Sequence, residues 1–387
     1  MDVYLDLENA TPLPEPVLKA MLPYFGERAY GHSALTHRVG WEAYAAVEAS
    51  LGRLALALGV QPEDLAITHD AVEAANLAFE GLVLGRPAKR KTVVLSAIEP
   101  LNVMYAAEKL EQHGFRVVKV PVDAEGFVRE DALAEACTGD TLCVAVSWVS
   151  HEIGTIQHLD RLAAIVREQA PEAYFISDLS DAFGRLPFEG TALPIDIGIV
   201  TSYKVFGPRG AAALFKGTRV KLKPLLAGPY STQPLWPGDE NLPALAGFAE
   251  AAERAVAELG ARSAHMRRLR DRLIAGLLTI PNTILNGPRA ERVPDNANIS
   301  FLGAEGEAIT VECSDRGVYV SSGSACTRRM LQPSHVLLAI GRQYEAAHGS
   351  ILMKISPFHT DADIDHVLRV FPEAIERLRK LSGFKEA

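Results

Sequence analysis

Short apolar runs alternate with amphipathic stretches along the first half of the chain. The apolar runs are rich in valine, isoleucine and leucine and fall at 93–96, 117–120, 142–146, 173–176 and 197–201. Helical patterns lie before or between them at 71–84, 101–113, 130–137 and 159–169. Such alternation is typical of β-α-β units, and short continuous apolar strands fit a sheet covered on both faces. The pattern therefore predicts an α/β fold with a mainly parallel sheet.

The pattern changes at residues 228–243, which are rich in proline and glycine. This composition predicts a long surface loop. We expect a long helix next, over about 244–278, and then a smaller domain. Its expected strands lie near 298–302, 317–321 and 351–355, and its expected helices at 334–340 and 361–381. We predict a large domain at 13–243 and a small domain made of 1–12 and 244–387.

The composition is typical of a globular protein. The chain has 387 residues, of which 48% are hydrophobic and 22% are charged, and this length suggests two domains. A formal net charge of −9 argues against nonspecific binding to nucleic acid or to an anionic membrane. No apolar run approaches the roughly 20 residues that span a bilayer, and no secretory signal is visible. We therefore expect a cytoplasmic protein without nucleic-acid or membrane partners.

The chain contains four cysteines: Cys137, Cys143, Cys313 and Cys326. They show neither C-x-x-C pairing nor metal-ligand spacing with histidines, so we predict no metal site and four reduced thiols, three of them buried. Cys326 differs, because it lies in Ser-Ser-Gly-Ser-Ala-Cys-Thr at 321–327 and precedes Arg328 and Arg329. Small residues allow movement, and nearby cations favour the reactive thiolate. We predict a mobile loop at about 321–330 with Cys326 as a nucleophile.

A lysine follows the apolar run at 197–201, the last strand predicted in the first half of the chain. Lys204 lies in Thr-Ser-Tyr-Lys-Val-Phe-Gly-Pro-Arg-Gly at 201–210, and a lysine at such a strand end can form a Schiff base with an aldehyde cofactor. Thr201 offers a hydroxyl to a phosphate. Asp178 closes the preceding strand, at the edge where open α/β sheets bind ligands, and suits a pyridinium nitrogen. Taken singly, Lys204 could be a solvated surface lysine and Asp178 could cap a helix, and these interpretations are simpler. Because Asp178 and Lys204 follow one another along the chain, each at the end of an apolar strand, the sequence favours a pyridoxal 5′-phosphate (PLP) site.

A helix start offers a place for the phosphate of such a cofactor. Thr-His-Asp-Ala at 68–71 opens the helix predicted at 71–84. The free N–H groups and the dipole of a helix start favour an anion. Asp70, Ala71 and Val72 are therefore candidates for contact with the cofactor. The alternative is simple capping of the helix by Asp70.

With these residues the chain resembles the cysteine desulfurases, a class V aminotransferase branch of the fold type I PLP enzymes. The resemblance covers nearly the whole chain, and the motif at 321–327 is its most specific part. Other matching motifs, in chain order, are Tyr4-Leu5-Asp6 with Asn9-Ala10-Thr11-Pro12, His37-Arg38-Val39-Gly40-Trp41, Glu73 with Asn76-Leu77-Ala78, Glu152-Ile153-Gly154 with Gln157, Gly207-Pro208-Arg209-Gly210, Glu240-Asn241 with Pro243, Pro333-Ser334-His335-Val336-Leu337, and Thr360-Asp361-Ala362-Asp363-Ile364-Asp365.

This resemblance implies a fold type I architecture, with a three-layer αβα large domain and a smaller α+β domain. It also implies a homodimer, an amino-acid substrate and a scaffold or carrier protein that accepts sulfur. Lys204 would hold PLP as an aldimine and shuttle the proton, Asp178 would pair with the ring nitrogen, and Thr201 would bind phosphate. Cys326 would attack the sulfur of PLP-bound cysteine, which leaves a persulfide and releases alanine.

The departures from the family pattern cluster on the cofactor. Pro100 stands where the family has a histidine that stacks on the ring, and proline has neither a π face nor a titratable group. Val72 replaces a phosphate-binding threonine, and Asp239 replaces the threonine that the partner subunit supplies. A carboxylate about 4 Å from a phosphate costs on the order of 4 kcal/mol per charge pair at an effective dielectric constant of about 20.

The surroundings of the ring hydroxyl also differ. His151 and Asp181 stand where the family has asparagine and glutamine, and Tyr203 stands where it has histidine. All three are candidates for contact with the cofactor. His151 is in addition a candidate catalytic residue, because an imidazole there can act as an acid or a base. A histidine with ordinary loop contacts is the alternative.

The substrate side has changed too. Leu352 stands where the family has the arginine that grips the substrate carboxylate. Lys354 lies two residues further on, on the same face of a strand, although lysine lacks the bidentate fork of arginine. We predict Lys354 and Asn9 as substrate-binding residues.

Three functions remain compatible with this sequence. The first, which we predict, is a PLP-dependent enzyme that takes sulfur from cysteine or a related thiol compound as a persulfide on Cys326. The second is a catalytically degenerate relative that acts as a binding or assembly subunit or as a sulfur carrier. The third is a PLP enzyme with a changed reaction, in which His151, Asp181 and Tyr203 surround the ring hydroxyl.

Overall fold

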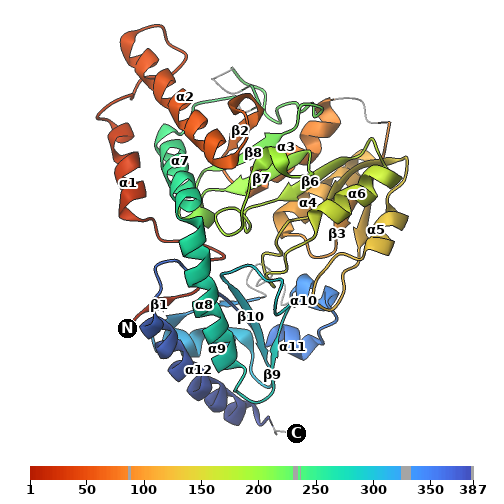
Figure 1. Cartoon of the computed structure of the whole chain (residues 1–387), viewed down its shortest axis with the longest axis vertical. Coiled ribbons are helices and arrows are strands. Elements are labelled where there is room, and N and C mark those ends of the chain that lie inside the picture. The colour runs from red at the N-terminus through yellow and green to blue at the C-terminus, as the bar shows by residue number, and fades with distance from the viewer. Residues whose placement is uncertain (86–88, 230–233, 236, 324–332, 385–387) are drawn as a thin grey trace.

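A seven-stranded sheet forms the centre of the larger part of the molecule (Figure 1). The computed structural model describes residues 1–85, 89–229, 234–235, 237–323 and 333–384. Within these residues the strand order is β2-β8-β7-β6-β5-β3-β4. The strands are β2 (Leu65–Thr68), β3 (Thr92–Ser96), β4 (Arg116–Val120), β5 (Thr141–Ala145), β6 (Tyr174–Asp178), β7 (Ile197–Thr201) and β8 (Ala212–Lys216). β8 runs antiparallel to β2 and β7, and the other pairs are parallel, which confirms a mainly parallel sheet.

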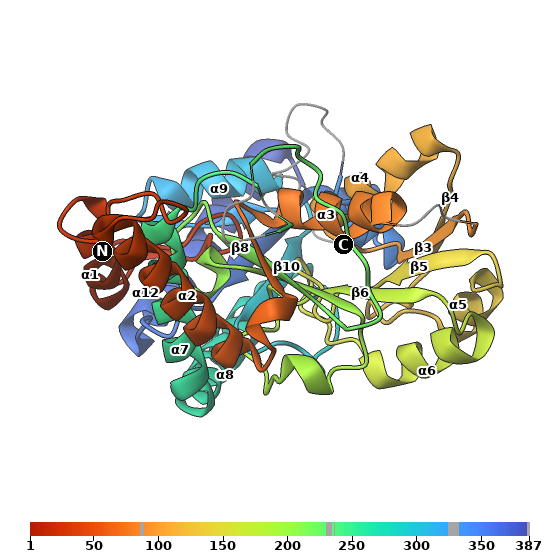
Figure 2. The ribbon, with the colours of Figure 1, turned by 90° about the horizontal axis from the view of Figure 1, so that it is seen from above.

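Helices cover both faces of this sheet because its strands lack a polar face. Along β3, Val93 and Leu95 pack with α3 and α4, whereas Val94 packs on the opposite side with α5 and α6. α2 and α7 cover β2, β7 and β8, and Figure 2 shows α3 and α4 on one side of the strands and α6 and α7 on the other. The predicted three-layer αβα arrangement is confirmed.

The helices of the described residues have the following bounds. They are α1 (Glu15–Met21), α2 (Arg38–Leu58), α3 (Ala71–Gly85), α4 (Leu101–Glu108), α5 (Glu130–Ala136), α6 (Leu159–Gln169), α7 (Leu242–Ala257), α8 (Leu259–Leu277), α9 (Gly306–Ser314), α10 (His335–Ala339), α11 (Tyr344–His348) and α12 (Asp361–Ser382). Among the residues described, no helix is both long and apolar enough to cross a membrane.

A smaller antiparallel sheet forms the rest of the molecule, in the strand order β12-β13-β10-β9. Its strands are β9 (Thr283–Leu285), β10 (Asn296–Phe301), β12 (Ser321–Ser322) and β13 (Ser350–Lys354). A separate parallel pair joins β1 (Val3–Tyr4) to β11 (Val318–Tyr319). The core of this part joins residues of β1, β10 and β13 with the buried faces of α8, α9 and α12. The N-terminus therefore packs with the C-terminal part of the chain (Figure 1).

The single long helix expected over about 244–278 is two helices, and this expectation was wrong. α7 ends at Ala257 and α8 begins at Leu259, because Glu258 between them has a ψ of 7°, away from the helical value. The buried side of α7 belongs to the core that also contains α2, whereas α8 packs in the core of the small sheet. The break lies where the chain passes from one core to the other, so each helix can turn its apolar side to its own core.

Candidate functional site

Two neighbouring strands of the large sheet end at the candidate site. Asp178 is the last residue of β6, and Thr201 is the last residue of the parallel neighbour β7. A 3-10 helical turn, Tyr203–Val205, places Lys204 directly after β7. Phe206 then reverses the chain with a φ of 65°, which is uncommon for a residue other than glycine. The carboxyl edge of the sheet thus brings Asp178, Thr201 and Lys204 to one region.

The amine of Lys204 is buried among charged side chains. Its Nζ lies 2.6 Å from Oε2 of Glu8 and 3.1 Å from each carboxylate oxygen of Asp181. Lys354 on β13 places its own Nζ 2.5 Å from the same Oε2 of Glu8 and also pairs with Asp181. We call Glu8, Asp181, Lys204 and Lys354 the charge cluster. With two cations and two anions, its charges balance.

Hydrogen bonds hold the N-terminal segment against this cluster. Oη of Tyr203 donates to the carbonyl of Glu8 over 3.1 Å, and Oγ1 of Thr11 donates to the carbonyl of Tyr203 over 2.7 Å. The backbone N–H of Lys354 donates to the carbonyl of Leu5 over 2.9 Å. The cluster therefore joins the N-terminal segment, the large sheet and the small sheet.

The charges shift the proton affinities of the buried groups. Burial by itself lowers the pKa of Lys204, but the carboxylates of Asp181 and Glu8 outweigh burial and raise this pKa above its usual value. Burial by itself raises the pKa of Asp181, but Lys204, Lys354 and Arg185 together lower this pKa below the usual range. Lys204 is thus held as an ammonium and Asp181 as a carboxylate. Burial raises the pKa of Asp178.

A cavity of about 370 Å³ lies beside the cluster. Its helix side is formed by the starts of α3 and α4, namely Asp70, Ala71, Val72, Pro100, Leu101 and Asn102. Its strand side is formed by the N-terminal segment and the small sheet, namely Glu8, Asn9, Ser321, Ser322, Gly323 and Leu352. The remaining lining residues are His151, Glu152, Tyr203, Ser334 and His335.

The residues around this cavity fit PLP. Oγ1 of Thr201 is buried and has no hydrogen-bond partner among the described residues, so a phosphate oxygen would satisfy it. The first N–H groups of α3, at Ala71 and Val72, have no acceptor within the helix and favour an anion. Oδ1 of Asp178 accepts the N–H of Ser180 over 2.9 Å, which orients its carboxylate at the end of β6 for a pyridine nitrogen.

The two carboxylates that the sequence places near the phosphate are engaged elsewhere. Oδ1 of Asp70 accepts the N–H of Glu73 over 2.9 Å. Asp70 therefore caps α3, which is the alternative role that the sequence offered for this residue. Oδ1 of Asp239 lies 3.1 Å from Nε2 of His32. Val72 has no side-chain hydroxyl, so it can offer a phosphate only its backbone N–H.

Two titratable groups, the half-buried His151 and the buried Glu152, line the cavity next to each other. Burial lowers the pKa of His151 to about 4, and its Nδ1 has no partner among the described residues. Burial raises the pKa of Glu152 to about 8. Oε2 of Glu152 accepts from Oγ of Ser334 over 2.6 Å, whereas Oε1 is buried without a partner in the part of the chain described. A neutral imidazole can accept a proton, and a protonated carboxyl can donate one.

The structure brings most of the predicted site residues together. Those that line the cavity are Asn9, Asp70, Ala71, Val72, His151 and Tyr203. Four others do not line the cavity and are buried at the carboxyl edge of the large sheet or just after it, namely Asp178, Asp181, Thr201 and Lys204. Nδ2 of Asn9 donates to Oδ1 of Asp6 over 2.6 Å and to Oγ of Ser321 over 3.1 Å. The roles assigned to these residues stay predictions.

Two predicted residues differ from this group. Lys354 is only 1% exposed and directs its ammonium to the charge cluster, while Leu352 from the same strand lines the cavity. Cys326 lies outside the described residues, as does most of the loop predicted at about 321–330. The first two residues of that predicted loop form β12 instead, because Ser321 and Ser322 pair with β13.

The prediction from sequence missed Glu8 and assigned no role to Glu152, Ser334 or His335. Glu8 directly precedes the predicted residue Asn9, and this position near an apolar strand was its only signal in the sequence. Glu152 and Ser334 lie 182 residues apart and meet only in the fold.

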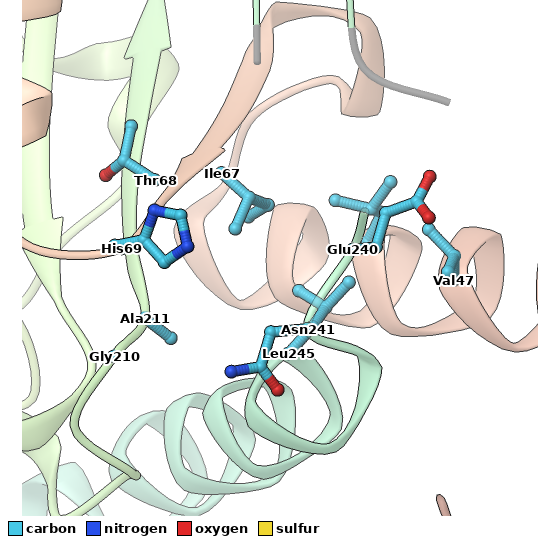
Figure 3. A pocket seen from close by; sticks show the side chains of 10 residues that line it. Val47, Ile67, Thr68, His69, Gly210, Ala211, Glu240, Asn241 and Leu245 are labelled. Carbon is cyan, nitrogen blue, oxygen red and sulfur yellow. The ribbon is translucent and has the colours of Figure 1, made fainter. Parts of the chain in front are cut away.

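A second, much smaller cavity lies between α2, the end of β2 and the start of α7 (Figure 3). Its lining includes Thr68, His69 and Asn241. Its volume of about 10 Å³ is close to the space that one water molecule needs. It is therefore too small for a phosphorylated pyridine, and the candidate site is the cavity beside the charge cluster.

Comparison with known proteins gives a consistent picture. The model of the family described as "Aminotransferase class-V" matches residues 3–367. The chain is 36% identical to cysteine desulfurase IscS 1 of Archaeoglobus fulgidus over 379 residues, which are 98% of each chain. It is also 36% identical to cysteine desulfurase IscS of Methanosarcina thermophila, over 98% of this chain and 93% of that protein. A solved NifS-like protein, 27% identical, superposes over 100% of both chains with a TM-score of 0.89.

Proposed function

Because the chain belongs to the class-V aminotransferase family, we propose that it is a PLP-dependent cysteine desulfurase-like enzyme. It takes sulfur from cysteine or a related thiol compound and receives it on Cys326. One observation carries this proposal. The buried amine of Lys204 lies at the carboxyl edge of the sheet, near the carboxylate of Asp178 and the hydroxyl of Thr201, which has no hydrogen-bond partner among the described residues.

Each residue of the site has a part in this reaction. When bound, PLP withdraws electrons from the substrate carbon that bears the amino group. Asp178 holds a proton on the ring nitrogen, and Thr201 with the start of α3 binds the phosphate. Lys204 would supply the amine that binds the aldehyde, and its Nζ would take up the substrate proton and pass it on. His151 accepts a proton at Nδ1, because burial keeps its imidazole neutral.

The sulfur step needs no external oxidant. The thiolate of Cys326 attacks the substrate sulfur, and the carbon–sulfur bond breaks. A sulfur–sulfur bond forms, so that Cys326 carries a persulfide and the two sulfurs are oxidised. The carbon retains the bonding electron pair, takes up a proton and leaves in alanine. Glu152, whose carboxyl lines the cavity, is the proton donor that we assign to this carbon.

The test is the capture of the cofactor by one lysine. Purified protein incubated with PLP should acquire the absorption of a PLP–lysine adduct, and borohydride reduction should fix the label on Lys204 in a peptide mass spectrum. Lys204→Ala should lose both signals. Cysteine should then yield alanine and a persulfide on Cys326, and Cys326→Ser should yield neither. A protein that takes up no PLP contradicts the proposal.

We also propose a homodimer and a protein that accepts sulfur from Cys326. Large apolar side chains are exposed on α2 and on the segment between α1 and α2, namely Phe25, Tyr30, Leu35, Trp41 and Tyr44. Exposed apolar groups of this kind mark interaction surfaces. Cys137, Cys143 and Cys313 are free thiols, which fits a reducing compartment, and we place the enzyme in the cytoplasm.

Replacement of Trp41, which is 62% exposed, tests the dimer contact. We expect Trp41→Glu to shift the protein from dimer to monomer, because a buried unpaired carboxylate opposes association. Light scattering coupled to gel filtration measures the mass. Leu56→Glu is the matched control, since Leu56 is 80% exposed on the same helix outside the apolar group. A monomeric wild type would refute the dimer.

A further inference from the structure

The strand side of the cavity is poor in positive charge. Its lining contains the carboxyl group of Glu8 and the apolar side chain of Leu352, together with Asn9, Ser321, Ser322 and Gly323. The amide of Asn9 and the hydroxyl of Ser321 already donate to other groups, whereas the buried hydroxyl of Ser322 has no partner among the described residues. Among the described lining residues, none is a lysine or an arginine. A carboxylate that leaves water needs a cation or several hydrogen-bond donors. This wall therefore offers little to a ligand carboxylate.

The two nearest ammonium groups are already paired. Lys204 and Lys354 are 4% and 1% exposed, and each contacts both Glu8 and Asp181. In the proposed function Lys204 binds the cofactor, so Lys354 is the ammonium that remains for a ligand. A ligand carboxylate would have to displace one of these carboxylates to reach an ammonium. Displacement would leave a buried carboxylate without its partner, so the exchange gains nothing.

The polar atoms that do face the cavity suit an uncharged group with N–H donors. The carboxylate of Glu8 lines the same cavity. An amide NH₂ can donate to such oxygens, whereas a carboxylate can only accept and would be repelled by Glu8. Leu352 offers contact to the apolar part of an ester or amide.

We propose that this enzyme prefers a small cysteine derivative whose carboxyl group is uncharged, an amide or an ester, over free cysteine. The proposal rests on the proposed function and names its substrate class. The chemistry is unchanged, because the same carbon–sulfur bond breaks and Cys326 receives the sulfur. The carbon takes up a proton and leaves as alaninamide or an alanine ester.

Two measurements on the PLP-loaded protein test the preference. Initial rates of product formation should give a kcat/KM for L-cysteinamide at least about tenfold above that for L-cysteine. Thermal unfolding with L-serinamide or L-serine, which resemble the two substrates but carry no sulfur, should show the larger rise in Tm with serinamide. Equal or better use of cysteine overturns the proposal and leaves the desulfurase function intact.

A single substitution should reverse the preference. Leu352→Arg places a guanidinium on the cavity wall and should raise kcat/KM for cysteine relative to cysteinamide by at least about tenfold. Val311→Arg adds the same charge at a position that is 64% exposed on α9 and should leave the preference as in the wild type. An unchanged preference in folded Leu352→Arg contradicts the proposal.

The outcomes separate the two levels of the argument. If neither compound yields a persulfide, the proposed function fails, and the comparison of serinamide with serine still decides the binding preference. If both compounds react and cysteine is preferred, the substrate class alone is wrong.

Discussion

The ammonium groups of Lys354 and Lys204 together balance the carboxylates of Glu8 and Asp181. Lys354→Met would leave two carboxylates facing one ammonium in a buried site. We expect the free energy of unfolding to fall by about 3–5 kcal/mol, the usual cost of an unpaired buried charge. Urea denaturation of the protein without cofactor measures the change. The amine of Lys204 should also become harder to deprotonate, so PLP should bind more slowly.

A double variant provides the control for this argument. Glu8→Gln combined with Lys354→Met removes one charge of each sign and should recover most of the lost stability. Strictly additive losses in the two single variants and the double variant would show that Glu8 and Lys354 do not interact.

Glu152 should make stability depend on pH. Its pKa in the folded protein is about 8, above the ordinary value of 4.5, so between these values the folded state keeps a proton that the unfolded state has lost. The resulting stabilisation is complete below pH 4.5 and is lost as the pH rises through 8. Each pH unit in this window corresponds to about 1.4 kcal/mol per group.

Glu152→Gln should therefore lose less stability than the wild type as the pH rises from 5 to 8, because its side chain does not titrate. The measurement is urea denaturation at several pH values. Glu63→Gln, at an exposed position, is the control and should keep the wild-type slope. Parallel curves for the wild type and Glu152→Gln would contradict the raised pKa.

The sequence indicated some residues of the site and not others for a physical reason. Asp178, Thr201 and Lys204 end or follow strands, so the strand pattern alone placed them at one edge of the sheet. Glu8 and Lys354 come from segments far apart in sequence, and no periodicity joins them to Asp181. Lys354 was correctly placed on a strand, but its ion pairs with Glu8 and Asp181 hold its ammonium in the charge cluster, and it does not line the cavity.

The strands of the large sheet were the best predicted elements. The run at 197–201 is β7, and β3, β4 and β5 begin one residue before their predicted starts. Continuous apolar runs between helices mark buried parallel strands clearly. β2 and β8 were not predicted, because Leu65–Thr68 and Ala212–Lys216 pair with each other in an antiparallel manner and stand outside the β-α-β alternation. The helix expected at 101–113 ends at Glu108 and continues as a 3-10 turn, Lys109–His113.

The close packing of β7 makes a specific prediction about Gly198. A Cβ atom at this position would clash with Cζ of Phe215 and would lie 2.8 Å from Cδ1 of Leu179. Gly198→Ala should therefore lower the free energy of unfolding by about 1–3 kcal/mol, the usual cost of overpacking a core. Gly52→Ala in α2 is the matched control, because no atom lies within 4 Å of its added Cβ. That change should instead stabilise the helix by about 0.5–1 kcal/mol. Urea denaturation measures whether each variant is less or more stable than the wild type. A Gly198→Ala variant that is more stable than the wild type would contradict the packing.

The two parts of the molecule are joined beside the candidate site. Arg185 follows β6 in the large part, and Asp295 directly precedes β10 in the small part. Nε of Arg185 donates to Oδ2 of Asp295, with side-chain exposures of 6% and 1%. Oγ of Ser263 on α8 also donates to the carbonyl of Arg185 over 2.7 Å. Arg185 also helps to lower the pKa of Asp181. The same arginine therefore connects the two parts of the molecule and acts electrostatically on the charge cluster.

Breaking this buried pair should weaken the whole molecule. Arg185→Met leaves Asp295 charged, buried and unpaired, and we expect a loss of about 3–5 kcal/mol in the free energy of unfolding. The double variant Arg185→Met/Asp295→Leu removes both charges and should recover most of that loss, because an apolar pair of similar volume is often as stable as a buried ion pair. Urea unfolding followed by fluorescence and by circular dichroism measures both variants. If Arg185→Met costs less than the double variant, the ion pair does not stabilise the contact between the two parts. If the two probes separate in Arg185→Met but coincide in the wild type, this pair is also what makes the two parts unfold together.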